Sequence, residues 1–225
     1  MNIGSRLKQV GDLVNKSSSV MDIGCDHAYL DIYLAEKKEL NLKKIIASDN
    51  KEGPLKQAKR NIKTYKVEKK IILKLGDGLS PYEKDIDTII ISGMGGRNMI
   101  GIFKEHLEYL KHIQTIILSP NNYQIDIKKF LVNNGYFIKE EHLVKEGKFI
   151  YQVIKFEKGK VKYTKREYFF GPLLLKEKNN LFIEYYAREL KSREILFPLL
   201  PQNYYLKKWK MKREIKILKE VLKKE

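Results

Sequence analysis

Between Val20 and Phe156 the chain alternates short runs of β-branched and other apolar residues with stretches of helical periodicity. This pattern is typical of βα units around a parallel sheet, where helices cover both faces of each strand. The run Thr88–Ile91 shows the uninterrupted apolar character of such a strand. A helix of suitable length can follow each of the first four strands. The predicted strands are Val20–Ile23, Lys44–Ser48, Lys70–Leu75, Asp87–Ser92, Gln114–Leu118, Tyr136–Leu143 and Lys148–Phe156.

The last two predicted strands are separated by only four residues, 144–147. Such a link is too short for a parallel crossover, so it predicts an antiparallel hairpin. An open parallel sheet that ends in an antiparallel hairpin is typical of the class I methyltransferase variant of the Rossmann-like fold. A dehydrogenase would more naturally continue with another crossover helix. We therefore expect an α/β fold with a seven-stranded sheet.

A polar break at residues 157–160 ends the strand–helix alternation. Beyond it, apolar pairs such as Leu181/Tyr185 recur at the i, i+4 spacing of a helix. Pro198 and Pro201 interrupt the helical pattern, which predicts two helices packed as an antiparallel, coiled-coil-like hairpin. We expect a Rossmann-like domain over residues 1–158 and a basic helical domain over residues 159–225. The predicted seam of the second helix is formed by Met211, Ile215, Leu218 and Leu222.

The chain of 225 residues carries a formal net charge of +17, which favours polyanionic partners such as nucleic acid. From residue 157 onward there are 19 basic and 9 acidic residues, so the surplus is concentrated on the predicted helical hairpin. An alternative is a compositional bias, because 38 of the 45 basic residues are lysines. A solvated helical face would also be rich in lysine.

Several classes of protein are disfavoured by composition. No apolar run approaches the ~20 residues of a membrane-spanning helix, and the N-terminus lacks the apolar core of a signal peptide, so we expect a cytoplasmic protein. The single cysteine, Cys25, cannot form an internal disulfide, and we expect it to be a packing residue rather than a nucleophile. The four histidines are too scattered for a zinc site, so no metal is expected.

The segment Asp22–Ala28 closes the first predicted strand and opens a helix. A glycine turn at this position lets backbone N–H groups approach a nucleotide-like cofactor. Asp26 stands where a second glycine would admit a pyrophosphate, which disfavours a dinucleotide and suits a cationic sulfonium and its amino group. The alternative is a tight βα turn in which Asp26 and Asp31 are helix caps. His27 is either a catalytic base or a hydrogen-bonded structural residue.

Polar residues also follow the next two predicted strands. Asp49 ends the second strand about 20 residues beyond the glycine turn, where an acidic side chain accepts hydrogen bonds from ribose hydroxyls. Asp77 lies between two glycines after the third strand and can accept from an adenine amino group. We expect Asn50 and Gly78, their neighbours, to contribute to the same site. The alternative for Asp77 and Gly78 is an ordinary Asp-Gly turn.

Two more turns complete this edge of the sheet. Ser92-Gly93-Met94-Gly95-Gly96 follows the fourth strand, and its glycines leave a floor for a flat base or a methionyl chain. After the fifth strand, Pro120 keeps the preceding residue extended, which would project Asn121 above the sheet to read a base. An ordinary Pro-Asn turn is the alternative. Because open α/β sheets bind ligands at the carboxyl ends of their strands, five such turns together predict a binding site.

Together these motifs resemble the bacterial tRNA (adenine-22-N1)-methyltransferase family, TrmK. The family usually has Ser at Cys25, Pro at Asp31 and Gln at Ser119, which puts in doubt a substrate contact by Ser119. The resemblance runs nearly end to end and rests on Ser5–Leu7, Asp22–Leu30, Gly76–Leu79, Ile91–Gly96, Ser119–Asn121, Tyr151–Ile154 and Phe170–Leu174.

The resemblance implies a methyltransferase that uses S-adenosylmethionine, has no metal and binds tRNA through its C-terminal hairpin. No obligate protein partner is evident. Alternatives are methylation of another RNA or of adenine N6, and a noncatalytic RNA-binding module on a degenerate fold. We expect catalytic roles for Asp26, His27 and Asn121. Cofactor contacts are expected from Asp22, Gly24, Asp49, Asn50, Asp77, Gly78, Ser92, Gly93 and Gly95, and RNA contacts from Arg6, Lys207, Lys208, Lys210, Lys212 and Arg213.

Overall fold

The computed structural model describes residues 3–223. They form two compact units, and the boundary along the chain falls between Leu173 and Leu174. The first unit therefore continues beyond residue 158, where the sequence places a domain boundary. In the described chain no helix is long and apolar enough to cross a membrane.

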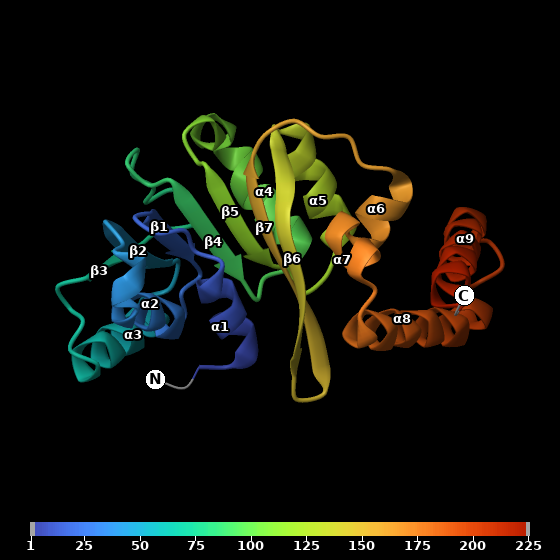
Figure 1. Ribbon diagram of the computed structural model, residues 1–225, viewed down its shortest axis with the longest axis horizontal. Coiled ribbons are helices and arrows are strands. Elements are labelled where there is room, and N and C mark those ends of the chain that lie inside the picture. Colours follow the sequence, from blue (N-terminus) through green and yellow to red (C-terminus); the bar gives the residue numbers. More distant parts are fainter. Residues whose placement is uncertain (1–2, 224–225) are drawn as a thin grey trace. The chain divides into compact units, whose positions relative to one another are not determined.

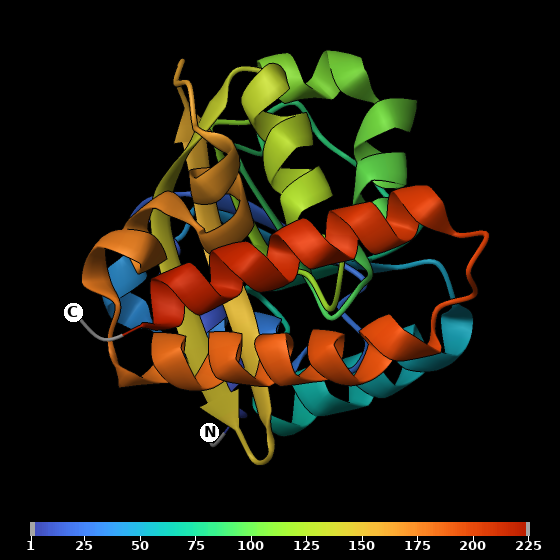
Figure 2. The same ribbon diagram turned by 90° about the vertical axis from the view of Figure 1, so that its right-hand side faces the viewer.

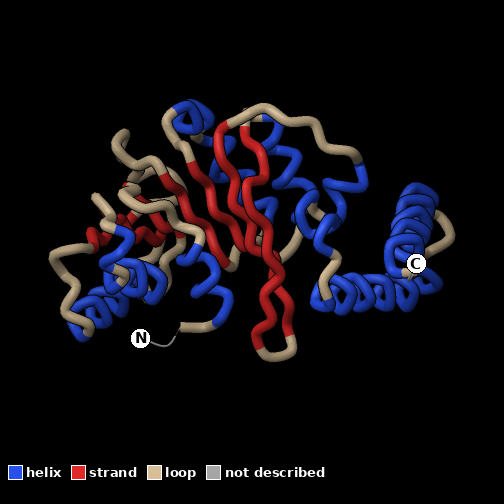
Figure 3. Tube along the Cα trace, viewed as in Figure 1, coloured by secondary structure: helices blue, strands red, loops and turns tan. Residues whose placement is uncertain are grey.

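A seven-stranded sheet forms the centre of the first unit, with the strand order β3-β2-β1-β4-β5-β7-β6 (Figures 1 and 3). The first five strands are parallel, and β7 pairs antiparallel with β5 and β6. The α/β fold and the terminal antiparallel hairpin are therefore confirmed. The strands are β1 (Ser19–Ile23), β2 (Lys44–Asp49), β3 (Ile71–Leu75), β4 (Thr88–Ser92), β5 (Thr115–Ser119), β6 (Tyr136–Glu146) and β7 (Phe149–Lys158).

Helices cover the two faces of this sheet in two separate apolar layers (Figure 1). Successive side chains of a strand point to opposite faces, so Val20 packs in one layer and Met21 in the other. The first layer includes α1 (Ser5–Asp12), α2 (Tyr29–Glu36) and α3 (Glu52–Thr64), and the second includes α4 (Gly96–Glu105) and α5 (Gln124–Asn133). Short 3₁₀ segments, η1 (Lys38–Leu40) and η2 (Leu107–Lys111), complete the connections.

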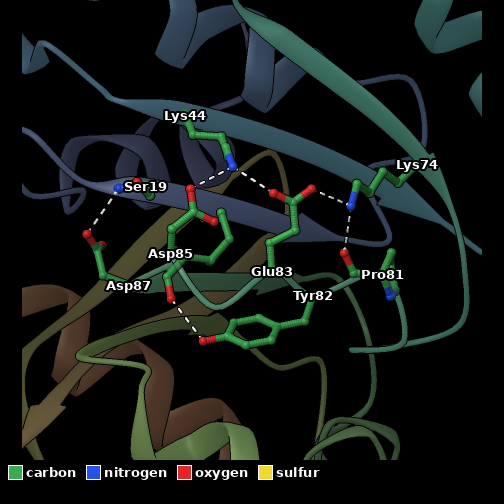
Figure 4. Close-up of polar contacts among 9 residues, drawn as sticks. Ser19, Lys44, Lys74, Pro81, Tyr82, Glu83, Asp85 and Asp87 are labelled. Atoms are coloured by element: carbon green, nitrogen blue, oxygen red, sulfur yellow. Dashed lines mark hydrogen bonds and ion pairs between the residues drawn. The ribbon is translucent and has the colours of Figure 1, made fainter.

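The prediction of a helix after β3 is wrong, because turns occupy residues 76–87. Ion pairs hold this connection in place of helix packing (Figure 4). The Lys44 ammonium lies 2.6 Å from a carboxylate oxygen of Glu83 and 2.6 Å from one of Asp85. Glu83 also pairs with Lys74, and these two lysines lower its pKa to about 2. The Asp87 carboxylate accepts from the Ser19 N–H at 3.1 Å, which anchors the start of β4.

A buried ion pair fixes the end of the first unit. The Lys128 ammonium lies 2.7 Å from the Glu141 carboxylate, and neither side chain is exposed. Glu141 also accepts from the Leu173 N–H at 3.1 Å, and a Cβ on Gly171 would lie 2.5 Å from its oxygens. Only glycine fits this approach, which is made at a φ of 92°. The sequence analysis missed two helices near this boundary. The first, α6 (Lys165–Phe170), belongs to the first unit, and the second, α7 (Pro172–Glu177), continues past Leu173 into the second unit.

The second unit contains α8 (Asn180–Leu199) and α9 (Tyr205–Leu222), which lie alongside each other as the predicted antiparallel hairpin (Figure 2). The Arg193 guanidinium joins them through Glu214 at 2.9 Å. Leu218 is buried in the seam as predicted, whereas Met211, Ile215 and Leu222 are only half-buried and the unpredicted Val221 is buried. Pro198 lies inside α8, one residue before its end, so it does not break the helix where expected. Proline cannot donate the i→i−4 hydrogen bond, and the helix ends one residue later at Leu199.

Candidate functional site

Two adjoining clefts lie at the carboxyl ends of the parallel strands. The first has a volume of about 460 Å³ and the second about 380 Å³. They share Gly24, Asp49, Asn50, Lys51 and Met94, so they form one continuous groove around the end of β2. In the sheet β1 lies next to β4. From β1 the strand order continues to β2 on one side, and from β4 it continues to β5 on the other side. The groove lies at this switch point, where open α/β sheets bind ligands.

The turn after β1 is held by the neighbouring strand. The N–H groups of Gly24 and Cys25 both donate to the Ser48 carbonyl at 2.9 Å. Gly24 has a φ of 76°, and a Cβ there would collide with the Met94 methyl group. This turn therefore needs glycine both for its backbone conformation and for the close approach of the β4 loop.

Asp26 and His27 follow in this turn and line the first cleft. The Asp26 side chain is 70% exposed, and its carboxylate lies 3.7 Å from His27 Nε2. Asp26 adopts a φ of 52°, a left-handed conformation that aspartate tolerates better than most residues. The carboxylate is thus held at the mouth of the cleft, with the imidazole beside it.

Asp49 connects the turn after β2 to the turn after β1. One carboxylate oxygen accepts from the Lys51 N–H at 3.0 Å, and the other accepts from the Asp26 N–H at 3.3 Å. Asp77 lies in the second cleft, where Asn50 donates to its carboxylate at 3.4 Å. The structure therefore brings the predicted ribose and adenine ligands together through Asn50.

Three carboxyl groups are packed at the base of the first cleft. Asp22 lines it and is only 4% exposed, and burial, reinforced by the nearby Asp49, raises its pKa to about 7. Asp31, behind it in α2, is fully buried and receives no hydrogen bond from another described residue. Burial and the charge of Asp22 raise the pKa of Asp31 well above its usual range. Because little in the protein compensates the charge of these buried carboxyl groups, they favour a cationic ligand.

Cys25 is buried beside these acids. Burial raises the pKa of its thiol, and the charges of Asp31 and Asp22 raise it further. A thiol with a raised pKa forms little of the nucleophilic thiolate. The structure agrees with the expectation that Cys25 is a packing residue.

The turns after β4 and β5 are bound to each other. Gly93 N–H donates to the Ser119 carbonyl at 3.0 Å, and Asn121 N–H donates to the Met94 carbonyl at 2.9 Å. The Asn121 side-chain amide donates to the Gly93 carbonyl. Its NH₂ group is thus engaged with the protein and leaves the side-chain oxygen free to accept. Ser119 is fully buried, so its side chain makes no contact with a ligand at the surface.

Most of the predicted cofactor residues line the groove. Asp22, Ser92 and Gly93 contribute to the first cleft, and Gly78 contributes to the second. Gly95 lines neither cleft. It is the N-cap of α4, and a Cβ there would lie 3.0 Å from the Asn122 side-chain oxygen. Asn121 also lies outside both clefts.

Arg6, predicted to bind RNA, lies in the first cleft. Its guanidinium carbon is 4.6 Å from the centre of the Tyr151 ring, and its backbone N–H donates to Glu146 at 2.9 Å. The other predicted RNA ligands all belong to α9, in the second unit. Lining residues that the sequence analysis did not assign are Leu7, Tyr29, Leu30, Lys51, Pro54, Asn98 and Ile102.

Lys51 could have been found, because it closely follows Asp49 at the end of a predicted strand, whereas Pro54 lies in the first turn of α3. Asn98 and Ile102 carried no such signal. They reach the second cleft only because α4 packs beside the turn at Gly78, where a Cβ would lie 3.0 Å from Ile102.

The groove fits S-adenosylmethionine. Asp49 and Asp77 offer acceptors for a ribose and an adenine, and the acids below Gly24 suit a sulfonium and an ammonium group. The described residues contain no group of three or more His, Cys, Asp or Glu side chains placed to hold a metal ion.

Known proteins are similar to this chain in sequence and in architecture. A tRNA (adenine(22)-N(1))-methyltransferase of Bacillus subtilis is 29% identical over 99% of this chain and 98% of its own length. The structure of Streptococcus pneumoniae Sp1610 with S-adenosyl-L-methionine is 31% identical, covers 99% of this chain and 100% of that one, and gives a TM-score of 0.89. Mycoplasma capricolum TrmK with S-adenosyl-homocysteine is 27% identical over 98% and 99% of the chains, with a TM-score of 0.84.

The model of the TrmK family, described as tRNA (adenine(22)-N(1))-methyltransferase, matches residues 20–221. The match includes the βα turns that form the groove as well as the helices of the second unit. This chain therefore belongs to the TrmK family of tRNA (adenine(22)-N(1))-methyltransferases.

Proposed function

We propose that this chain transfers the methyl group of S-adenosylmethionine to N1 of adenine 22 in tRNA, in the cytoplasm. The observation that carries the proposal is the groove at the ends of β1, β2 and β3, in which Gly24, Asp49 and Asp77 meet. Asp49 and Asp77 offer acceptors for a nucleoside, above acids that suit a cation.

The chain offers separate places for cofactor and base. Most of the predicted cofactor ligands lie in the turns after β1, β2 and β3. The turns that contain Gly93 and Asn121 are hydrogen-bonded to each other and extend this edge of the sheet toward β5. The target adenine enters over these two turns. Because N1 is on the Watson–Crick edge, a paired adenine must first leave its partner.

When bound, S-adenosylmethionine supplies an electrophilic methyl group on a sulfonium. N1 of adenine attacks with a lone pair and carries no proton to remove, so a general base at N1 is not required. The protein's task is to align the base and to stabilise the positive charge that the ring acquires. Asp26 performs the second task at the cleft mouth, while His27 and the Asn121 oxygen orient the base.

Arg6 and the α8–α9 hairpin hold the tRNA. On α9 the Arg213 guanidinium carbon lies 4.7 Å from the centre of the Trp209 ring, which combines a cation for phosphate with an aromatic surface. The five predicted α9 ligands face solvent at least in part. Each phosphate that they neutralise releases counterions, which makes the affinity depend on salt.

The activity is tested with an unmodified tRNA transcript and isotope-labelled S-adenosylmethionine. Mass spectrometry of the nucleosides should show labelled 1-methyladenosine, and mapping should place it at position 22. A transcript with guanine at position 22 is the control and should stay unlabelled. Labelled N6-methyladenosine, or label in another RNA only, would overturn the proposal.

The role of the hairpin is tested by charge reversal at exposed Lys207, Lys210 and Lys212. The plot of log affinity against log salt should become less steep by up to about 0.9 for each phosphate that the hairpin no longer neutralises. The control reverses Lys59, Arg60 and Lys63 on α3, which changes the net charge equally. If both sets weakened tRNA binding alike, only the total charge would matter and the hairpin would have no specific role.

A further inference from the structure

An exposed cation–aromatic pair lies at the starts of α4 and α5, outside both clefts. The Arg97 guanidinium carbon is 4.0 Å from the centre of the Tyr123 ring. Arg97 is exposed, and Tyr123 keeps 42% of its surface accessible. Neither residue has a part in the cofactor groove.

The backbone holds this pair rigidly beside the proposed base site. Gly96 N–H donates to the Asn122 carbonyl at 3.1 Å, and a Cβ on Gly96 would lie 2.7 Å from that oxygen. The two turns can therefore approach only because residue 96 is glycine. Arg97 is three residues from Met94, so at most about 11 Å of chain separates the pair from the groove.

Each residue of the pair occupies a position that is locally unfavourable for its type. Tyr123 has a φ of 52°, which is unfavourable for a bulky side chain. Arg97 lies in the first turn of α4, where the helix dipole disfavours a cation, and no acidic residue is present in that turn. An unfavourable backbone conformation and an unfavourably placed cation occur together at one exposed place beside the groove. Such a combination indicates a ligand-binding role.

We propose that the Arg97–Tyr123 pair is a stacking platform for an unpaired nucleobase that flanks the target adenine. This inference rests on the proposed function. A planar guanidinium over a tyrosine ring presents flat surfaces to a base, and such stacking tolerates any base. The platform holds the neighbouring nucleotide while the target base leaves the stack toward Met94.

The test compares Tyr123→Ala, Tyr123→Phe and Arg97→Lys in the full chain, with unmodified tRNA as the ligand. Loss of one stacked base should weaken tRNA binding about 5- to 150-fold in Tyr123→Ala. Tyr123→Phe keeps the ring and should bind within about twofold of the natural chain. Arg97→Lys keeps the charge but loses the plane and should weaken binding.

Two controls separate stacking from damage to the fold and from simple charge. S-adenosylmethionine affinity and the unfolding temperature should stay unchanged in all three variants. Lys104→Ala removes an exposed cation from the other end of α4 and should leave tRNA binding almost unchanged. A direct probe is tRNA with 2-aminopurine beside adenine 22, whose fluorescence should be quenched by the natural chain and not by Tyr123→Ala.

Normal tRNA binding by Tyr123→Ala would overturn the inference. So would equal losses in Tyr123→Ala and Tyr123→Phe, since the hydroxyl would then be the contact. Full retention by Arg97→Lys would mean that Arg97 acts as a charge for phosphate and not as a stacking surface. These outcomes are distinct from failure of the proposed function, in which the natural chain itself would leave adenine 22 unmethylated.

Discussion

The Asp49 carboxylate accepts a hydrogen bond from the backbone N–H of Asp26, with 3.3 Å between the two atoms. This contact joins the residue proposed to bind the ribose to the residue proposed to stabilise the charged base. Cofactor binding and charge stabilisation therefore share one structural support. Changes at Asp49 and Asp26 should have related but distinguishable effects.

Asp49→Ala should lower the affinity for S-adenosylmethionine about 10- to 150-fold, because hydrogen bonds to a charged acceptor contribute about 1.5–3 kcal/mol. It should also slow the single-turnover rate at saturating cofactor, since the Asp26 turn loses its support. Calorimetry and rapid quench measure the two effects. Asp85→Ala, a change at an aspartate that lines neither cleft, is the control. Unchanged affinity in a folded Asp49→Ala chain would show that the ribose is bound by another residue.

Asp26→Asn should lower the single-turnover rate by about 100-fold or more while cofactor affinity stays close to normal. Asparagine has the same shape and tolerates the left-handed backbone at this position, so the turn should keep its conformation. A rate near that of the natural chain would reject the electrostatic role. Loss of cofactor binding instead would make Asp26 a cofactor ligand.

The raised pKa of Asp22 should make stability fall as the pH rises from about 4 to about 7. In this range the folded chain holds a proton that the unfolded chain has released, because the pKa is about 7 when folded and 3.8 otherwise. Asp31 contributes with the same sign. Denaturant unfolding of Asp22→Asn should show a flatter dependence over this window. An unchanged slope would show that Asp22 does not titrate there.

The same Asp22 proton should be released when a cationic ligand binds. A positive charge in the cleft favours the ionised carboxyl, so S-adenosylmethionine should bind with net proton release near pH 7. Calorimetry in buffers of different ionisation enthalpy measures this release. It should disappear in Asp22→Asn, and its persistence there would assign the proton to another group.

Glu83 should change the pH dependence of stability in the direction opposite to Asp22, and at lower pH. Its pairs with Lys44 and Lys74 lower the folded pKa from 4.5 to about 2. The stabilisation is therefore present above about pH 4.5 and lost as the pH falls toward 2. The free energy of unfolding of Glu83→Gln should fall less steeply as the pH decreases over this window. The difference should be small because solvent screens these ion pairs. Identical acid unfolding of the two chains would count against the ion pairs.

Much of the fold could be predicted because strand patterns are local. Runs such as Thr88–Ile91 are buried on both faces, and the short link before β7 allowed only a hairpin. The missing helix after β3 could not be foreseen. Residues 76–87 are held by Lys44 and Ser19 from distant parts of the chain, and no local pattern reveals such partners.

The candidate site was predictable to the extent that it follows strand ends. Asp49 and Asp77 were found in this way and both line the groove. Asn121 follows a strand end too, but its amide is turned onto the Gly93 carbonyl. Arg6 was assigned to RNA binding alongside the family resemblance, and the contacts of α1 with Glu146 and Tyr151 hold it at the cleft.

The buried Lys128–Glu141 pair has a consequence for how related sequences can diverge. Replacing either partner alone leaves an unpaired charge in an apolar interior, which costs about 3–5 kcal/mol. Replacing both by apolar residues is close to neutral, but the Leu173 N–H would then lose its acceptor. Relatives should therefore change positions 128 and 141 together. Where they do, glycine at position 171 should no longer be obligatory for space, although its backbone conformation would still favour it.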